Sequence, residues 1–91
     1  MSNRAERGAV AYDPQIALIH SLSAQLGAMA GVEPRVIYDD GIAHIEVEVT
    51  DDLLRRWERA IPVLSRGDAF GLTDTETGQI AWLRISRDGN H

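Results

Sequence analysis

The chain of 91 residues is 44% hydrophobic and has a formal net charge of −5 at pH 7, and its length predicts one domain that buries about 60 to 65% of the surface of the unfolded chain. The absence of cysteine excludes disulfide bonds, thiolate metal sites and cysteine nucleophiles. The acidic charge disfavours a general nucleic-acid-binding protein, which would carry a basic surface.

The two ends of the chain differ from the sequence between them. Residues 1–12 lack hydrophobic periodicity and are predicted to form a flexible tail, and residues 87–91 a frayed C-terminus, which leaves a single domain at residues 13–86. No run of about 18 apolar residues and no signal-peptide pattern occurs, which predicts a cytoplasmic protein without a membrane partner. All nine basic residues are arginine, a bias that GC-rich bacterial genomes favour.

The first element is predicted in "DPQIALIHSLSAQLGAMAG", residues 13–31. Asp13 suits the N-cap, and Pro14 suits the first helical position, where no backbone N–H is needed. Apolar residues recur every three or four positions, and Gly31 can adopt the left-handed conformation that ends many helices. The pattern predicts an amphipathic helix with a buried face formed by Ile16, Ile19, Leu22, Leu26 and Met29.

A β-hairpin is predicted next, in "RVIYDDGIAHIEVEV". Asp40 and Gly41 are typical of a two-residue type I′ turn, because both central positions of that turn have positive φ. Such a turn also fixes the pairing register. The predicted pairs are Tyr38 with Ala43, Val36 with Ile45 and Arg35 with Glu46.

A second helix is predicted to begin after Thr50, a good N-cap residue. Asp51 and Asp52 follow it, where acidic side chains favour the positive end of the helix dipole. Pro62 lacks a backbone N–H and predicts a kink or a fresh turn near Ile61. The predicted buried stripe consists of Leu53, Trp57, Ile61 and Leu64.

The last part of the domain, "AFGLTDTETGQIAWLRI", predicts two strands around a glycine-containing loop. We therefore predict an α+β fold in the order helix, hairpin, helix, hairpin (αββαββ), with a four-stranded antiparallel sheet and both helices packed on one face. The two halves also resemble each other, since "GIAHIEV" aligns with "QIAWLRI", residue 42 on residue 80. This similarity arises either from an internal duplication or by chance.

Three polar side chains, His44, Glu46 and Glu48, alternate along the strand after the turn. Neighbours on one face stand about 6.5 to 7 Å apart, whereas metal ligands converge on one ion at about 2.0 to 2.2 Å. The pattern favours a solvated strand face with an Arg35–Glu46 pair. The adjacent aspartates are explained by turns and helix caps, and no nucleotide-binding or metalloprotease motif occurs. The sequence thus predicts no metal site, no cofactor and no catalytic residue.

A small basic patch is the second candidate site. It consists of Arg55, Arg56, Arg59 and Arg66. A phosphate backbone could bind there, but Glu58 lies among the arginines and the whole chain is acidic, so an ordinary exposed helical face is the favoured interpretation. Nucleic acid is a disfavoured partner.

Apolar residues occupy strand positions that the alternation predicts on the face away from the helices. An antiparallel sheet covered on one side normally exposes polar residues on the other. The exposed apolar face is covered either by the tail or a helix of the same chain, or by another protein chain. The predicted protein-binding residues are Ile37, Ile42, Phe70, Leu72, Ile80 and Trp82.

The functional prediction is a non-enzymatic protein-interaction module of the accessory or regulatory kind, which forms a homodimer through the sheet face. Trp82 would anchor that interface, so Trp82→Glu is expected to give a folded monomer. The first alternative is a DNA-associated regulator that uses the arginine-bearing helix. The second alternative is a small enzyme of unknown chemistry.

Overall fold

The computed structural model describes residues 14–86, so the predicted tail, the N-cap at Asp13 and the predicted frayed C-terminus lie outside the described residues. The fold is α+β with a four-stranded antiparallel sheet, as predicted. The predicted αββαββ order is wrong in one respect. The second helix is divided into two short helices, and the described elements follow the order αββααββ.

Helix α2, Pro14–Ala30, confirms the first predicted helix. Gly31 has a φ of +76° and donates its N–H to the Gly27 carbonyl at 2.8 Å, which closes the helix in the left-handed conformation. The predicted buried face is correct at its centre, where Ile19, Leu22 and Leu26 are buried. Ile16 and Met29, at its two ends, are only partly buried.

Strands β1, Arg35–Asp39, and β2, Ile42–Glu48, form the first hairpin. Asp40 and Gly41 have φ values of +53° and +81°, as a type I′ turn requires. All three predicted pairs are present: Tyr38 with Ala43, Val36 with Ile45 and Arg35 with Glu46. The two-residue turn therefore sets the register, as predicted.

Helices α3, Asp51–Arg55, and α4, Trp57–Leu64, replace the single helix predicted after Thr50. Thr50 is the N-cap of α3, as predicted, and its Oγ1 accepts a hydrogen bond from the Leu53 N–H at 3.1 Å. Its hydroxyl also donates to the Ala30 carbonyl at 2.7 Å. One side chain thus links the end of α2 to the start of α3.

The fresh turn predicted near Ile61 is wrong, because α4 continues through Pro62 and the break lies at Arg56. Arg56 has φ −110° and ψ 22°, and its N–H donates to the Leu53 carbonyl at 3.0 Å. Its own carbonyl accepts from the Ala60 N–H, so Arg56 ends one helix and begins the next. Pro62 is exposed, so the one helical carbonyl that it leaves without a donor is open to water.

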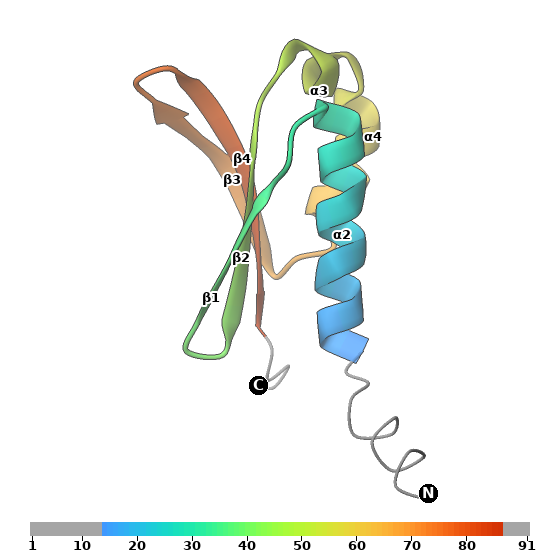
Figure 1. The fold of residues 1–91 in the computed structure, drawn as a ribbon, viewed down its shortest axis with the longest axis vertical. Coiled ribbons are helices and arrows are strands. Elements are labelled where there is room, and N and C mark those ends of the chain that lie inside the picture. The colour runs from blue at the N-terminus through green and yellow to red at the C-terminus, as the bar shows by residue number, and fades with distance from the viewer. Residues whose placement is uncertain (1–13, 87–91) are drawn as a thin grey trace, which may run out of the picture.

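Strands β3, Ala69–Thr75, and β4, Gly78–Ser86, form the second hairpin. The strand order is β1-β2-β4-β3, so the two hairpins join through β2 and β4, while β1 and β3 are the edges. The helices lie together on one side of the sheet, and the tip of the β3–β4 hairpin projects away from them (Figure 1).

The core lies between the helices and the inner face of the two central strands. Its sheet side consists of Ala43, Ile45, Val47, Ala81, Leu83 and Ile85. Its helical side consists of Ile19, Leu22, Leu26, Ala30, Leu53, Ala60 and Leu64. The stripe predicted for the second helix is confirmed at Leu53 and Leu64, and Trp57 is partly buried and packs against the core. The prediction is wrong at Ile61, which is 37% exposed, because the break at Arg56 turns Ala60 inward.

The pairing of the central strands is consistent with an internal repeat. The alignment of the two halves matches Ile45 with Leu83, and the same two residues lie opposite each other in the β2–β4 pair. In the strand order β1-β2-β4-β3, the two edge strands also occupy equivalent positions on either side of this pair. No helix among residues 14–86 is long and apolar enough to cross a membrane.

Candidate functional site

Trp82 lies near the centre of the outer face of the sheet, the face away from the helices. It is paired with Glu46 on β2 and with Gly71 on β3. Its indole stacks on the His44 ring, with centroids 5.6 Å apart and ring planes at 15°. The Arg84 guanidinium carbon lies 5.0 Å from the indole centroid, within cation–π range. Trp82 is thus partly covered by side chains of its own chain.

Gly71 provides the space for this indole. A Cβ placed on Gly71 would lie only 3.0 Å from Cζ2 and 3.3 Å from Cε2 of Trp82. Sequence reasoning missed this contact, although a glycine between two large apolar residues in a strand often marks a close approach. It also missed Arg84, whose position two residues after Trp82 puts both side chains on one face.

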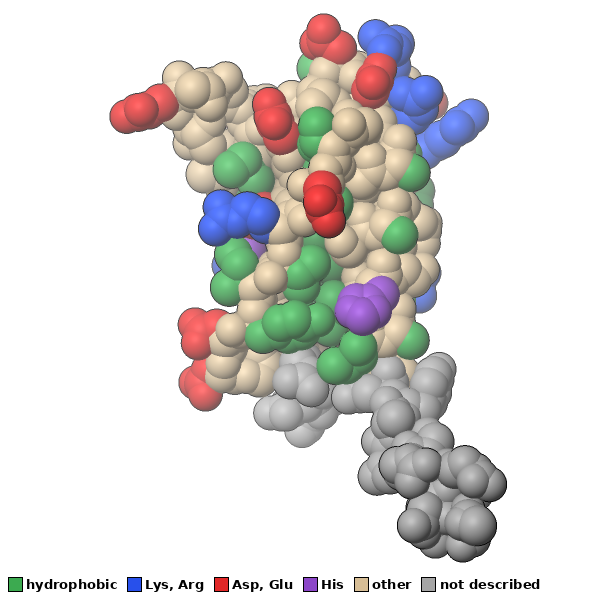
Figure 2. Space-filling model, in the orientation of Figure 1, with side chains coloured by type: hydrophobic (Ala, Val, Ile, Leu, Met, Phe, Trp, Pro, Cys, Tyr) green, Lys and Arg blue, Asp and Glu red, His purple; other side chains and the backbone are tan. Residues whose placement is uncertain are grey.

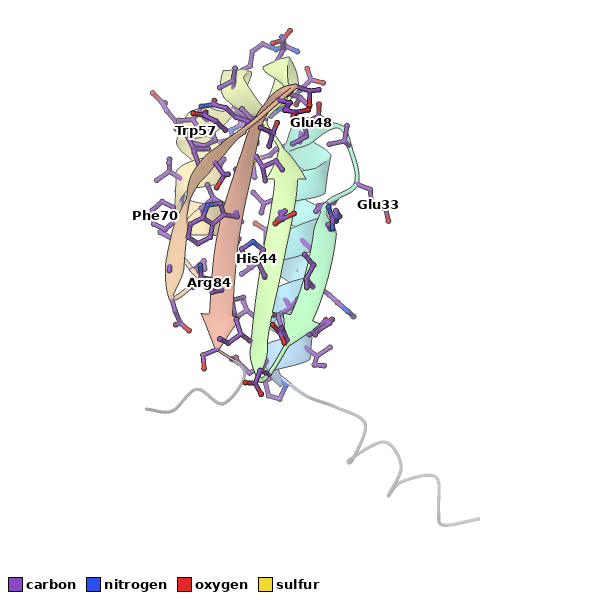
Figure 3. All side chains as sticks on the ribbon, turned by 90° about the vertical axis from the view of Figure 1, so that its left-hand side faces the viewer. Glu33, His44, Glu48, Trp57, Phe70 and Arg84 are labelled. Atoms are coloured by element: carbon purple, nitrogen blue, oxygen red, sulfur yellow. The ribbon has the colours of Figure 1, made fainter. Side chains whose placement is uncertain are left out.

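The polar residues of the outer face form partly exposed pairs. His44 Nε2 lies 3.1 Å from Glu46 Oε2, and Arg35 Nη1 lies 3.9 Å from Glu46 Oε1. The predicted Arg35–Glu46 pair is therefore present. Within residues 14–86, no group of three or more histidine, aspartate or glutamate side chains is placed to hold a metal ion. Figure 3 shows His44 and Arg84 side by side near the middle of the sheet.

The six predicted protein-binding residues do not form one surface. Phe70 and Leu72 are paired with Leu83 and Ala81, which face the helices, so the prediction that they share the face of Trp82 is wrong. They remain 44% and 48% exposed because they lie on the edge strand. In Figure 3 the Phe70 side chain extends from the outer edge of the sheet, away from His44 and Arg84.

The other four predicted residues lie on the outer face but are separated along it. Ile37 and Ile42 are 37% and 39% exposed and lie at the end of the sheet near the first turn. Ile80 is paired with Glu48, six residues along β2 from Ile42, which corresponds to about 20 Å. Trp82 and its polar neighbours lie between them. The outer face is therefore not a continuous apolar patch.

A groove lies beyond Ile80, between the β3–β4 hairpin, the end of β2 and the connection from α2 to β1. Its volume is about 280 Å³, at the lower limit of small-molecule sites. Three carboxylates and one guanidinium line it: Glu33, Glu46, Glu48 and Arg35. Figure 3 shows Glu33 and Glu48 near this end of the sheet. The groove is open and charged, unlike the apolar pockets that bind most small molecules.

The four predicted nucleic-acid-binding arginines are divided between two places. Arg55 and Arg56 lie at the end of α3, and both form ion pairs with Asp52. Arg59 lies in the first turn of α4, whereas Arg66 follows the far end of that helix. Figure 2 shows the basic side chains gathered over α3 and the start of α4, beside acidic ones. The patch is therefore partly neutralised by its own helix.

Comparison with protein-family models, with curated proteins and with solved structures found no match for this chain. The function of the site is therefore argued from its geometry.

Proposed function

We propose that this chain is a non-enzymatic protein-interaction module of the accessory or regulatory kind and that it acts as a homodimer. The observation that carries the proposal is the pair of large apolar side chains left exposed on the edge strand β3. These are Phe70 and Leu72, which are 44% and 48% exposed. An unpaired edge strand with exposed apolar side chains is a surface to which another strand can add.

A DNA-associated regulator has less support. Asp52 engages both Arg55 and Arg56, so these arginines are less available to phosphates. An enzyme has the least support, because the side chains that would be its catalytic candidates have structural roles. His44 and Glu46 contact each other on a partly covered strand face, and Asp51 and Asp52 lie in the first turn of α3.

Sedimentation equilibrium of the 91-residue chain tests the proposal. We expect the average mass to rise towards that of a dimer as the concentration increases from about 1 µM to about 300 µM, since even a dissociation constant near 100 µM would be visible in this range. A monomer mass over the whole range would contradict the homodimer.

A further inference from the structure

We propose that β3 is the strand through which two copies of this chain join. The second copy would add its own β3 antiparallel to the first, with the two-fold axis passing through Gly71, and the two sheets would become one sheet of eight strands. This inference rests on the proposed homodimer and names its contact surface. Strand addition of this kind uses backbone hydrogen bonds for affinity and side-chain pairs for register.

Strand β3 has few of the features that keep an edge strand from pairing. All seven residues of Ala69–Thr75 are paired with β4 in consecutive register, so the strand contains no bulge. It has no proline or basic residue, and its single charge, Asp74, lies near the turn. The other edge, β1, is shorter and carries a charge at each end, Arg35 and Asp39. Bulges, prolines and charges are the usual protections of an edge, so β3 is the less protected one.

The backbone N–H and C=O groups that point to the open edge of β3 include those of its two most apolar residues, Phe70 and Leu72. The Gln79 carbonyl accepts a hydrogen bond from the N–H of Val49, which follows β2, and the Arg84 carbonyl accepts one from the N–H of Asp68, which precedes β3. Odd-numbered residues of β4 therefore bond to β2, and even-numbered residues bond to β3. These residues are paired with Ala69, Gly71, Thr73 and Thr75. Alternation along an antiparallel strand then directs the N–H and C=O groups of Phe70, Leu72 and Asp74 to the open edge.

The side chains of β3 are self-complementary about Gly71. An axis at that residue places Phe70 of each copy opposite Leu72 of the other, both in hydrogen-bonding positions. These two side chains are 44% and 48% exposed, and they lie on the same face of the sheet. Each would cover the other, which is the reason for choosing a second copy rather than an unrelated strand. Axes at neighbouring residues would instead place Phe70 or Leu72 opposite a polar side chain.

The indole of Trp82 lies beside the proposed axis. Three of its ring atoms lie within 3.0 to 3.4 Å of the point where a Cβ of Gly71 would be. Paired strands lie about 4.8 Å apart, so an axis at Gly71 would place the near edges of the two indoles on either side of the new strand pair. Any larger residue at position 71 would displace the indole from this position.

The charges at the ends of β3 are compatible with this register. Asp68 of one copy would lie opposite Asp74 of the other, but both carboxylates are held towards β4. Asp68 Oδ2 accepts from the Ser86 N–H at 2.7 Å, and Asp74 Oδ1 accepts from Gln79 Nε2 at 3.0 Å. The same register brings the hairpin turn with Glu76 beside the segment that contains Arg66 of the second copy.

A lysine substitution at the edge tests the location. Leu72→Lys places a charge on the proposed contact, and we expect it to weaken dimerisation at least about tenfold, as edge lysines prevent pairing in natural sheets. Ile37→Lys is the matched control, because Ile37 is similarly exposed but lies on the outer face of β1. We expect it to leave the dissociation constant within about twofold of wild type. Sedimentation equilibrium measures both, and circular dichroism checks that both variants are folded.

Disulfide cross-linking tests the register, and the chain has no cysteine of its own. An axis at Gly71 places Ala69 of one copy opposite Thr73 of the other in a non-hydrogen-bonded pair, whose Cα separation of about 4.5 Å suits a disulfide. An equimolar mixture of Ala69→Cys and Thr73→Cys should therefore form a linked heterodimer under mild oxidation. Each variant alone should stay largely unlinked, because like residues lie about 13 Å apart in this register.

The outcomes separate the two proposals. If Ile37→Lys weakens the dimer and Leu72→Lys does not, the homodimer proposal stands and the β3 contact is wrong. Equal linking of each cysteine variant with itself would overturn the axis at Gly71. A monomer at every concentration, whether β3 is bare or covered by residues 1–13 of its own chain, would overturn both this inference and the proposed function.

Discussion

Thr50 joins two helices through one hydroxyl group, and its removal gives the best-defined stability prediction. The hydroxyl accepts from the Leu53 N–H at 3.1 Å and donates to the Ala30 carbonyl at 2.7 Å. The first bond caps α3, and the second satisfies a carbonyl in the last turn of α2. Thr50→Ala removes both bonds and leaves the backbone conformation allowed.

The magnitude follows from these two contacts. Loss of the N-cap costs about 1 kcal/mol, and leaving the partly buried Ala30 carbonyl without its donor costs about 1 kcal/mol more. We therefore expect Thr50→Ala to lower the free energy of unfolding by about 2 kcal/mol. For a domain of this size that corresponds to a fall of about 8 to 16 °C in Tm. Thr50→Ser keeps the hydroxyl and should retain most of the stability.

Urea unfolding followed by tryptophan fluorescence and far-ultraviolet circular dichroism measures the difference. The comparison between alanine and serine isolates the hydroxyl, because both variants lose the threonine methyl group. Equal unfolding midpoints for Thr50→Ala and Thr50→Ser would refute the reasoning, since the two hydrogen bonds would then contribute nothing.

Three further predictions concern the first turn and the two rejected sites. Gly41→Ala should destabilise the fold by about 1 kcal/mol, because Gly41 has a φ of +81°; urea unfolding would show no change if the turn tolerated a side chain. Calorimetric titration with zinc or manganese should give no stoichiometric binding, and micromolar binding lost in His44→Ala would reverse the assignment of the outer face. Duplex DNA should not bind at physiological salt, and binding that disappears when Arg55, Arg56 and Arg59 are all replaced by alanine would favour the DNA-associated regulator.

The two hairpins show which local signals carry enough information to fix a register. Asp40 and Gly41 adopt positive φ more readily than other residue pairs, so the length of the first turn and every pair of the first hairpin follow from them. The second turn consists of Glu76 and Thr77, which have no such preference. A shift of one residue moves each side chain of a strand to the other face. No register was predicted for the second hairpin, so nothing local fixed the face of Phe70 and Leu72.

The contacts of Trp82 depend on strands that are distant in the sequence. Its position on the outer face followed from alternation, and the structure agrees. Its stacking on His44 depends on the order β2-β4 in the sheet, and its contact with Gly71 depends on the register of the second hairpin. Neither was fixed by a local pattern. The sequence therefore predicted that this residue faces outward, but not that its own chain partly covers it.

The exposure of Phe70 and Leu72 has a different cause from the one that alternation suggested. Both residues are on the face that the helices cover, but α2 packs against β2, and β3 lies at the edge beyond the central strands. Residues of the inner face are therefore buried on β2 and β4 and exposed on β3, as Leu83 and its partner Phe70 illustrate. An apolar residue at such an edge becomes more buried when another strand extends the sheet. The exposure of Phe70 and Leu72 is thus the observation that supports the proposed association through β3.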